Sequence, residues 1–269
     1  MYENEPRTVG GVLDAGVRLY RGAFTRVVVT AAKGFAAVFL LEVVFELVFG
    51  VSSASLNAAD VDAIDPANIA AYLVLVPLSL LISLLTTAAV IVHLHRIATN
   101  APEGDAGVYA AALRRVLPYV GTSILYGIAT VLGAILLIVP GVWLSIAFLP
   151  AIYLVFTEQL GPIGALRRSF SIVRGNWWRT ATIVLVSSFI VLVIQAGIVS
   201  LPAFLAGVVA AAGDGQIATS WVLVLNFLNA IAQALSIPLA IAMGLAIVRD
   251  LVIRASGEDL EARLDAAAG

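Results

Sequence analysis

The chain alternates long apolar stretches with short polar ones. A helix needs about 20 mostly apolar residues to cross about 30 Å of membrane hydrocarbon. Six stretches approach or exceed this length, and they lie near residues 27–51, 69–92, 116–139, 142–157, 177–211 and 220–248. The pattern therefore predicts an all-α, polytopic membrane protein with six transmembrane helices.

Composition supports this class of protein. Hydrophobic residues make up 61% of the 269 residues and charged residues only 12%, which is outside the range of soluble domains. The chain has no cysteine, so disulfides, thiolate nucleophiles and cysteine-based metal sites are excluded. We expect one membrane domain over residues 1–269.

The arginines gather on one side of the predicted bundle. If the six helices alternate in direction, every arginine falls in segments of the same side: residues 1–26, 93–115, 158–179 and the C-terminal tail. The opposite loops, around Asp60, Asp62 and Asp65 and around Asp214, contain no lysine or arginine. Because positively charged loops are retained in the cytoplasm, we expect a plasma-membrane protein with both termini in the cytoplasm.

Tryptophan and proline mark the ends of the predicted spans. Indole side chains favour the membrane interface, and this topology places Trp143 and Trp221 at outer ends and Trp177 and Trp178 at inner ends. Residues 140–141, Pro-Gly, predict a helix stop and a tight turn. The third and fourth stretches should therefore form a hairpin.

Residues 162–175 have the pattern of an amphipathic helix. Ile163 and Phe170 fall on one face, whereas Arg167 and Arg174 fall on another. A helix of this kind lies flat in the membrane interface.

Residues 7–24 and 106–117 repeat this design. The sequence ALRR stands at residues 112–115 and again at 165–168, and each of the three amphipathic segments precedes a pair of apolar stretches. The repeat predicts three units, each an interfacial basic helix followed by a transmembrane hairpin.

The amphipathic segments supply a candidate belt for lipid headgroups or for another membrane protein. Anionic lipids attract each basic side chain near the surface by about 1 kcal/mol. The alternative is that these arginines only fix the topology. The belt consists of Arg18, Arg21, Arg114, Arg115, Arg167, Arg168 and Arg174.

Residues 137–179 carry a combination of features that resembles a known family. They include the Pro-Gly pair at 140–141, Pro150, Glu158, the ALRRSF run at 165–170, Arg174, Trp177 and Trp178. Together they resemble the membrane domain attached to some prokaryotic glycerophosphoryl diester phosphodiesterases and related stand-alone six-span membrane proteins. The phosphodiesterase of that family is a separate barrel domain, for which we expect no counterpart here. The resemblance therefore implies a fold and a membrane location without a reaction.

The sequence contains little that indicates a catalytic or metal-binding site. His93 and His95 are two residues apart, so on a helix they point to different faces. The sequence contains no HExxH and no GxSxG motif, and its arginines are tied to the membrane edge rather than to a nucleic-acid surface. We expect no metal, no cofactor, no nucleic-acid partner and no enzymatic activity, and a membrane enzyme is the least favoured alternative.

Polar residues inside the predicted spans form a second candidate site. Glu42 and Glu46 are one helical turn apart in the first span, and a carboxylate at such a depth costs about 2.5 to 3.5 kcal/mol on insertion scales. Each should therefore face the bundle interior, a water-filled cavity or a partner. Four amides in later spans could join them: Gln195, Asn226, Asn229 and Gln233.

This intramembrane polar site has two interpretations. The plainer one is hydrogen bonding between helices, worth about 0.6 kcal/mol for each bond. The other is a ligand or proton site, as in a small proton- or cation-coupled transporter that uses Glu42 and Glu46. The repeat favours a non-enzymatic binding module over a transporter, because each unit begins on the same side, unlike the inverted repeats common in carriers.

Overall fold

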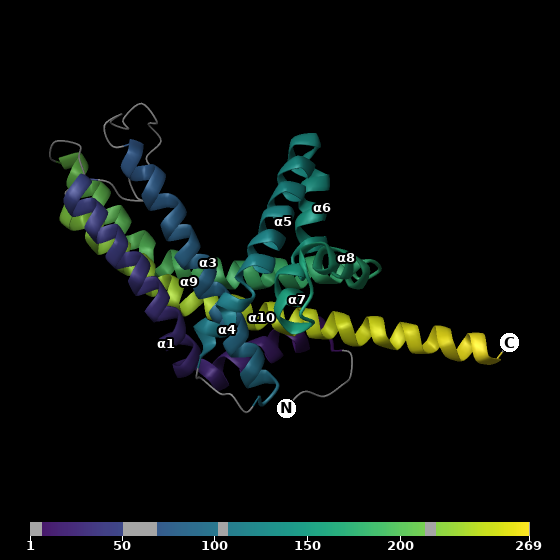
Figure 1. Cartoon of the computed structure of the whole chain (residues 1–269). Coiled ribbons are helices and arrows are strands. Elements are labelled where there is room, and N and C mark those ends of the chain that lie inside the picture. Colours follow the sequence, from purple (N-terminus) through teal and green to yellow (C-terminus); the bar gives the residue numbers. More distant parts are fainter. Residues whose placement is uncertain (1–6, 51–68, 102–106, 213–218, 269) are drawn as a thin grey trace. The chain divides into compact units, whose positions relative to one another are not determined.

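The computed structural model describes residues 7–50, 69–101, 107–212 and 219–268. Within these ranges the backbone forms helices and the turns that join them (Figure 1). The aspartates that define the predicted outer loops, Asp60, Asp62, Asp65 and Asp214, lie outside the described residues, and so does the side chain of Arg263.

Six helical stretches are long and apolar enough to cross a membrane, which confirms the prediction of an all-α, multi-pass membrane protein. They are α1 (Val9–Phe49), α3 (Ile69–Ala98), α5 (Val116–Leu136), α6 (Ile138–Phe148) together with α7 (Ala151–Thr157), α9 (Trp177–Ala212) and α10 (Thr219–Ala268). Two short helices, α4 (Val108–Arg114) and α8 (Pro162–Val173), precede α5 and α9.

The three predicted interfacial segments differ in how they join the spans. The first predicted interfacial segment, from residue 9 onward, and the first span are parts of one continuous helix, α1. No proline lies between them, so nothing removes a backbone hydrogen bond at the predicted boundary. In contrast, α8 is a separate helix close to the predicted residues 162–175, and Arg115 separates α4 from α5.

The prolines of the last two spans do not end helices. Pro202 lies within α9 and Pro238 lies within α10. A proline in a membrane helix is tolerated where neighbouring groups satisfy the backbone carbonyl that it leaves without a donor. Helix α9 therefore continues past Pro202 to Ala212.

The chain divides into two compact units that are interleaved along the sequence. Unit 1 comprises Met1–Phe24, Ala88–Phe189 and Leu239–Gly269, and unit 2 comprises Thr25–Thr87 and Ile190–Pro238. Each unit is built from several chain segments, so neither corresponds to a continuous domain. The single membrane domain over residues 1–269 stays a prediction.

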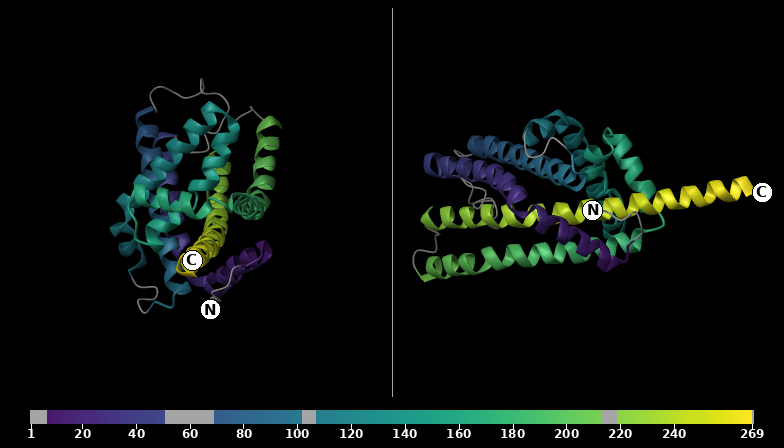
Figure 2. Two further views of the ribbon diagram at one scale, coloured as in Figure 1. Left: turned by 90° about the vertical axis from the view of Figure 1, so that its right-hand side faces the viewer. Right: turned by 90° about the horizontal axis from the view of Figure 1, so that it is seen from below.

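Unit 2 is a bundle of apolar helical segments from α1, α3, α9 and α10, which run alongside one another in the right-hand view of Figure 2. Helices α1 and α3 approach closely at Gly34, where an added Cβ would lie 1.9 Å from Thr86 Oγ1. Helices α1 and α10 meet at Phe39 and Phe227, whose ring centroids are 5.5 Å apart. Small and aromatic residues thus set the helix spacing in this unit.

Unit 1 contains the predicted hairpin, formed by α5 and α6, but its turn lies elsewhere than predicted. Leu137 is the one residue between the two helices and has an extended backbone. Pro140 is the third residue of α6, where a missing N–H costs no helical hydrogen bond. Gly141 lies against α5, because an added Cβ would be 2.7 Å from the Ala134 backbone. The Pro-Gly pair therefore begins α6 instead of ending α5.

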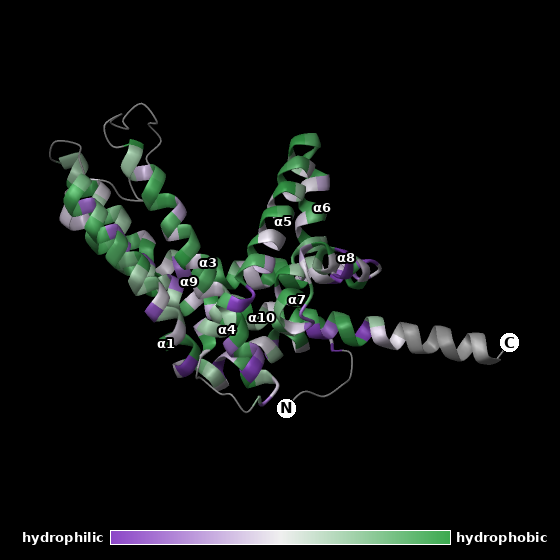
Figure 3. Ribbon diagram, viewed as in Figure 1, coloured by the Kyte–Doolittle hydropathy of each residue, from purple (hydrophilic) through white to green (hydrophobic). Residues whose placement is uncertain are grey.

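The predicted fourth span is interrupted by Pro150. Helix α6 ends at Phe148, and α7 begins after Pro150 and ends at Thr157. The chain then returns as α8, which packs against α5, α6 and α7. In Figure 3, hydrophilic residues concentrate on α8, whereas α5 and α6 are largely hydrophobic.

Helix α8 and the start of α9 lie against α6. Ser169 Oγ donates a hydrogen bond to the Ala147 carbonyl at 2.7 Å, and Trp177 Nε1 donates to the Trp143 carbonyl at 3.2 Å. The prediction that Trp143 and Trp177 mark opposite ends of spans is therefore wrong. The chain reverses between α7 and α8, where Gln159 has a positive φ of 57°, and this reversal brings Trp177 back beside α6.

Candidate functional site

A buried aspartate organises one charged cluster in unit 1, which we call the Asp250 network. The Asp250 side chain is 4% exposed and accepts hydrogen bonds from Arg179 at 2.9 Å and from Arg254 at 3.0 Å. It also accepts one from the backbone N–H of Arg7 at 2.9 Å. The guanidinium groups of Arg179 and Arg254 in turn donate to the Arg7 carbonyl. The network ties the residues before α1 to α9 and α10.

The belt arginines divide into those that hold the fold and those that face outward. Arg115 Nη1 donates to the Gln159 carbonyl at 2.9 Å, and Arg168 Nε lies 3.3 Å from Glu158 Oε2. Arg18 pairs with Asp14 on the exposed surface of α1. The remaining belt side chains are exposed, and they are Arg21, Arg114, Arg167 and Arg174.

Two of the belt arginines line a cationic cavity of about 310 Å³, which we call the arginine pocket. It lies where the end of α3 meets α4, the start of α5 and the end of α7. In the part of the chain that the structure describes, its polar lining consists of three guanidinium groups, one imidazole and one amide, without a carboxylate. The lining residues are Val92, His95, Arg96, Ala111, Arg114, Arg115, Phe156 and Gln159.

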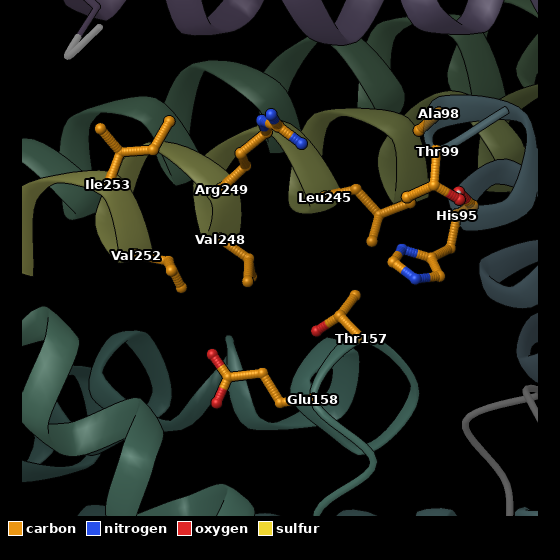
Figure 4. Close-up of a pocket in the computed structure, with 10 residues that line it drawn as sticks. All are labelled: His95, Ala98, Thr99, Thr157, Glu158, Leu245, Val248, Arg249, Val252 and Ile253. Carbon is orange, nitrogen blue, oxygen red and sulfur yellow. The ribbon is translucent and has the colours of Figure 1, made fainter. Parts of the chain in front are cut away.

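A neighbouring cavity of about 290 Å³, here the Glu158 pocket, shares His95 with the arginine pocket (Figure 4). In Figure 4, Leu245, Val248 and Val252 of α10 form an apolar wall opposite Thr157 and Glu158. The Arg249 guanidinium points away from that side of α10. The other lining residues are Ala98, Thr99 and Ile253.

Polar groups on one wall of the Glu158 pocket could bind a ligand. Thr157 Oγ1 is buried and has no hydrogen-bond partner among the described residues. Glu158 lies beside it at the end of α7, and His95 points into the same space (Figure 4). The pocket combines an apolar wall with hydrogen-bonding groups, as expected for part of an amphipathic molecule.

A third cavity, of about 380 Å³, lies between the first half of α1 and the end of α3. Its apolar lining comes from Ala15, Leu19, Gly22, Ile97 and Ala98, and its polar lining from Arg7, Arg18 and Asn100. Arg18 therefore belongs to a second cationic cavity of the belt.

The predicted intramembrane residues all belong to unit 2, but they have different surroundings. Glu42 is 7% exposed and Asn226 is 5% exposed, whereas Asn229 is exposed. The contact between Phe39 and Phe227 shows that the helices carrying Glu42 and Asn226 are adjacent at this level.

Gln195 is engaged with a different residue of the last span. Its Nε2 donates to Ser236 Oγ at 3.0 Å. Ser236 lies ten residues beyond Asn226 on α10, which corresponds to about 15 Å along a helix. Glu46 and Gln233 are half-buried. A shared pocket for the six predicted residues stays a prediction.

Sequence reasoning did not identify Asp250, His95 or Arg96 as site residues. Asp250 was the most accessible to prediction, because it is flanked by Arg249 and stands four residues before Arg254 in a helical stretch. His95 and Arg96 could not be linked to Arg114 from sequence, because a loop whose path the sequence does not specify separates them. Within the described residues, no group of three histidine, aspartate or glutamate side chains could hold a metal ion.

Comparisons with family models, with curated proteins and with solved structures give no match to this chain. The resemblance of residues 137–179 to the phosphodiesterase membrane domain therefore stays a prediction.

Proposed function

We propose that this chain is a non-enzymatic protein of the plasma membrane, with cytoplasmic termini, whose basic belt binds the phosphate of an anionic lipid. The observation that carries the proposal is the arginine pocket. Arg96, Arg114 and Arg115 line one cavity, and its lining contains no carboxylate among the described residues. Such a cavity favours an anion over a cation.

The chemistry of the pocket suits a phosphate group. Guanidinium groups present several N–H donors in a planar arrangement that matches phosphate oxygens. Val92 and Phe156 add apolar surface beside them, and the Glu158 pocket continues beyond His95 with the apolar wall of α10. One lipid molecule could contact both pockets. Its headgroup would bind the guanidinium groups, and its apolar part would lie against the apolar wall of α10.

The Asp250 network supports the proposed topology. It joins Arg7, Arg179 and Arg254, which come from three distant parts of the sequence. An assembly of charged groups of this size requires water or headgroups nearby, because charges are costly in hydrocarbon. The residues before α1 and the start of α9 therefore belong to one side of the membrane, as positive-inside retention requires.

The test is retention of lipid by purified protein. We would compare an Arg96→Ala/Arg114→Ala variant with an Arg167→Ala/Arg174→Ala variant, here the α8 variant. The α8 variant removes the same charge from α8 and the residue that follows it, without altering the arginine pocket. Arg115 is left intact because it also bonds the Gln159 carbonyl. Native mass spectrometry would follow phosphatidylglycerol, with phosphatidylcholine as the neutral lipid.

A specific headgroup site predicts that the pocket variant loses most bound phosphatidylglycerol while the α8 variant retains most of it. Equal, small losses in both variants would show that the arginines serve only to fix topology. Retained lipid in both, together with loss of a co-purifying membrane protein, would favour a protein partner for the belt.

A second candidate function rests on the burial of Glu42. A carboxyl group that is 7% exposed in a membrane bundle, on a helix adjacent to the one carrying Asn226, fits a proton- or cation-coupled transporter. Glu42→Gln in proteoliposomes would abolish proton-coupled uptake if this function is correct. An unchanged proton flux in that variant would exclude the role of Glu42.

A further inference from the structure

The turn between α5 and α6 exposes an unusually apolar surface. Leu136, Ile138 and Val139 are each between 77% and 78% exposed. From residue 116 to residue 157 the sequence contains no charged side chain. A turn that reached water would place these side chains in contact with it at a large free-energy cost.

The backbone of this turn is also suited to an apolar environment. Leu137 is the one residue outside the two helices; its N–H donates to the Gly133 carbonyl at 3.0 Å, and its own carbonyl accepts from the Gly141 N–H at 3.3 Å. Pro140, in the first turn of α6, has no N–H to satisfy. Backbone groups in hydrocarbon need internal partners, and this turn provides them where the chain reverses.

The contacts of α6 limit how deep the turn can lie. Ser169 of α8 bonds the Ala147 carbonyl, and Leu137 is ten residues from Ala147, or about 15 Å along a helix. Even if α6 stood upright, the turn would lie about 15 Å beyond α8. The hydrocarbon is about 30 Å thick.

The second arm of the hairpin gives a similar limit. A Cβ on Gly121 of α5 would lie 3.0 Å from Pro162, the first residue of α8. Leu136 is fifteen residues further along α5, or about 22 Å. Both arms thus fall short of the distance from α8 to the far edge of the hydrocarbon.

The level of α8 is tied to polar surroundings. Trp177, which bonds the Trp143 carbonyl of α6, stands two residues before Arg179 of the Asp250 network. Arg167 is exposed on α8, and Arg174 is exposed directly after its last residue. Guanidinium groups are not stable in hydrocarbon without partners, so α8 marks a membrane boundary.

We propose that the α5–α6 hairpin enters the bilayer from the side of the basic belt and ends among lipid acyl chains, without emerging at the opposite face. Its partner is the hydrocarbon of the membrane. By length and composition, α5 could span a bilayer, and so could α6 together with α7. The contacts with α8 limit the hairpin to a smaller depth. The inference does not depend on headgroup binding by the arginine pocket.

The absence of cysteine from the chain allows a direct test. Single cysteines would be placed at Leu137 in the turn, at Ser171 on the exposed face of α8 and at Thr219, the first residue of α10. A membrane-impermeant maleimide would be added to intact cells and to inverted vesicles. We expect S171C to react from the belt side, T219C from the other side, and L137C from neither until detergent is added. Reaction of L137C from the same side and at the same rate as T219C would overturn the proposal.

A second measurement shows whether lipid or protein surrounds the turn. A spin label attached to the thiol of the L137C variant should collide frequently with oxygen, which is soluble in lipid, and rarely with a water-soluble nickel complex. Infrequent collision with both, or a disulfide cross-link between two copies of the L137C variant, would indicate a protein cover and overturn the proposal. V139C repeats both measurements if L137C alters folding, because Val139 is also exposed, at 77% against 66% for Leu137.

Discussion

Units 1 and 2 are both built from apolar helices, but they differ in their charged residues and in the contacts that stabilise them. Every arginine except Arg26 belongs to unit 1, where charged groups bond to carbonyls and carboxylates across distant segments. In the described part of unit 2 the charged residues are Arg26, Lys33, Glu42 and Glu46. Unit 1 is held by polar contacts as well as by apolar packing, and unit 2 mainly by close helix contact.

Helix α10 shows this difference within one element. Its residues from Ile241 to Val248, in unit 1, are buried, whereas Val224, Phe227 and Ile231, in unit 2, are exposed. Exposed apolar side chains on a membrane helix are suited to lipid contact. The same helix is thus a core element in one unit and a lipid-facing wall in the other.

The largest effect should come from breaking the Asp250 network. Asp250→Ala leaves two guanidinium groups without their buried carboxylate, and removing one partner of a buried ion pair costs about 3 kcal/mol or more. We expect a loss of that order in the free energy of unfolding, measured in lipid nanodiscs. Asp14→Ala is the matched control, because its pair with Arg18 is exposed and should be worth less than about 1 kcal/mol.

The next effect concerns the hairpin of unit 1. Leu137→Arg would place a charge in hydrocarbon if the turn lies there, at a cost of about 2.5 to 3.5 kcal/mol on insertion scales. We expect a marked fall in the inserted fraction in a membrane-insertion assay. Ile163→Arg, at an exposed position on α8, should insert nearly as well as the parent chain. Equal insertion of the two variants would contradict a buried turn.

Close packing in unit 2 should be sensitive to one methyl group. The Cβ of Gly34→Ala would overlap Thr86, and overpacking of this kind costs about 1 to 3 kcal/mol. Thermal unfolding should show the loss, and adding Thr86→Gly to the variant should recover part of it. A stable Gly34→Ala protein would mean that α1 and α3 separate easily.

The smallest effect tests the contact between α8 and α6. Ser169 is fully buried and its hydroxyl bonds the Ala147 carbonyl. Ser169→Ala should lower the free energy of unfolding by about 1 kcal/mol, the typical value of one hydrogen bond. Ser171→Ala, on the exposed face of the same helix, should leave it unchanged. A loss as large as that of Asp250→Ala would show that α8 depends on this one bond.

The helical class and the six apolar stretches could be predicted from sequence because both follow from local composition. A run of apolar residues long enough to cross hydrocarbon has few other stable conformations. The separate helix α8 was also accessible, because the periodic spacing of Ile163 and Phe170 and the opposite placement of Arg167 are local features.

The turn of the hairpin and the polar clusters were not accessible in the same way. Pro140 and Gly141 are compatible with either the end of one helix or the beginning of the next, and the packing of Gly141 on Ala134 decides between them. Trp143 and Trp177 became neighbours because the chain reverses between α7 and α8. The arginine pocket joins Arg96 to Arg114 across a loop, so no periodicity in the sequence predicts it.

The sequence by itself determined that this is a helical, multi-pass membrane protein with its arginines in the segments between apolar stretches, because hydrocarbon excludes charge wherever the chain folds. Tertiary structure alone decided which arginines hold the fold, through bonds to Asp250 and Gln159, and which arginines line a common pocket. It also decided how far the α5–α6 hairpin extends beyond α8. These depend on contacts between residues far apart in the chain, and local hydrophobicity carries no information about such contacts.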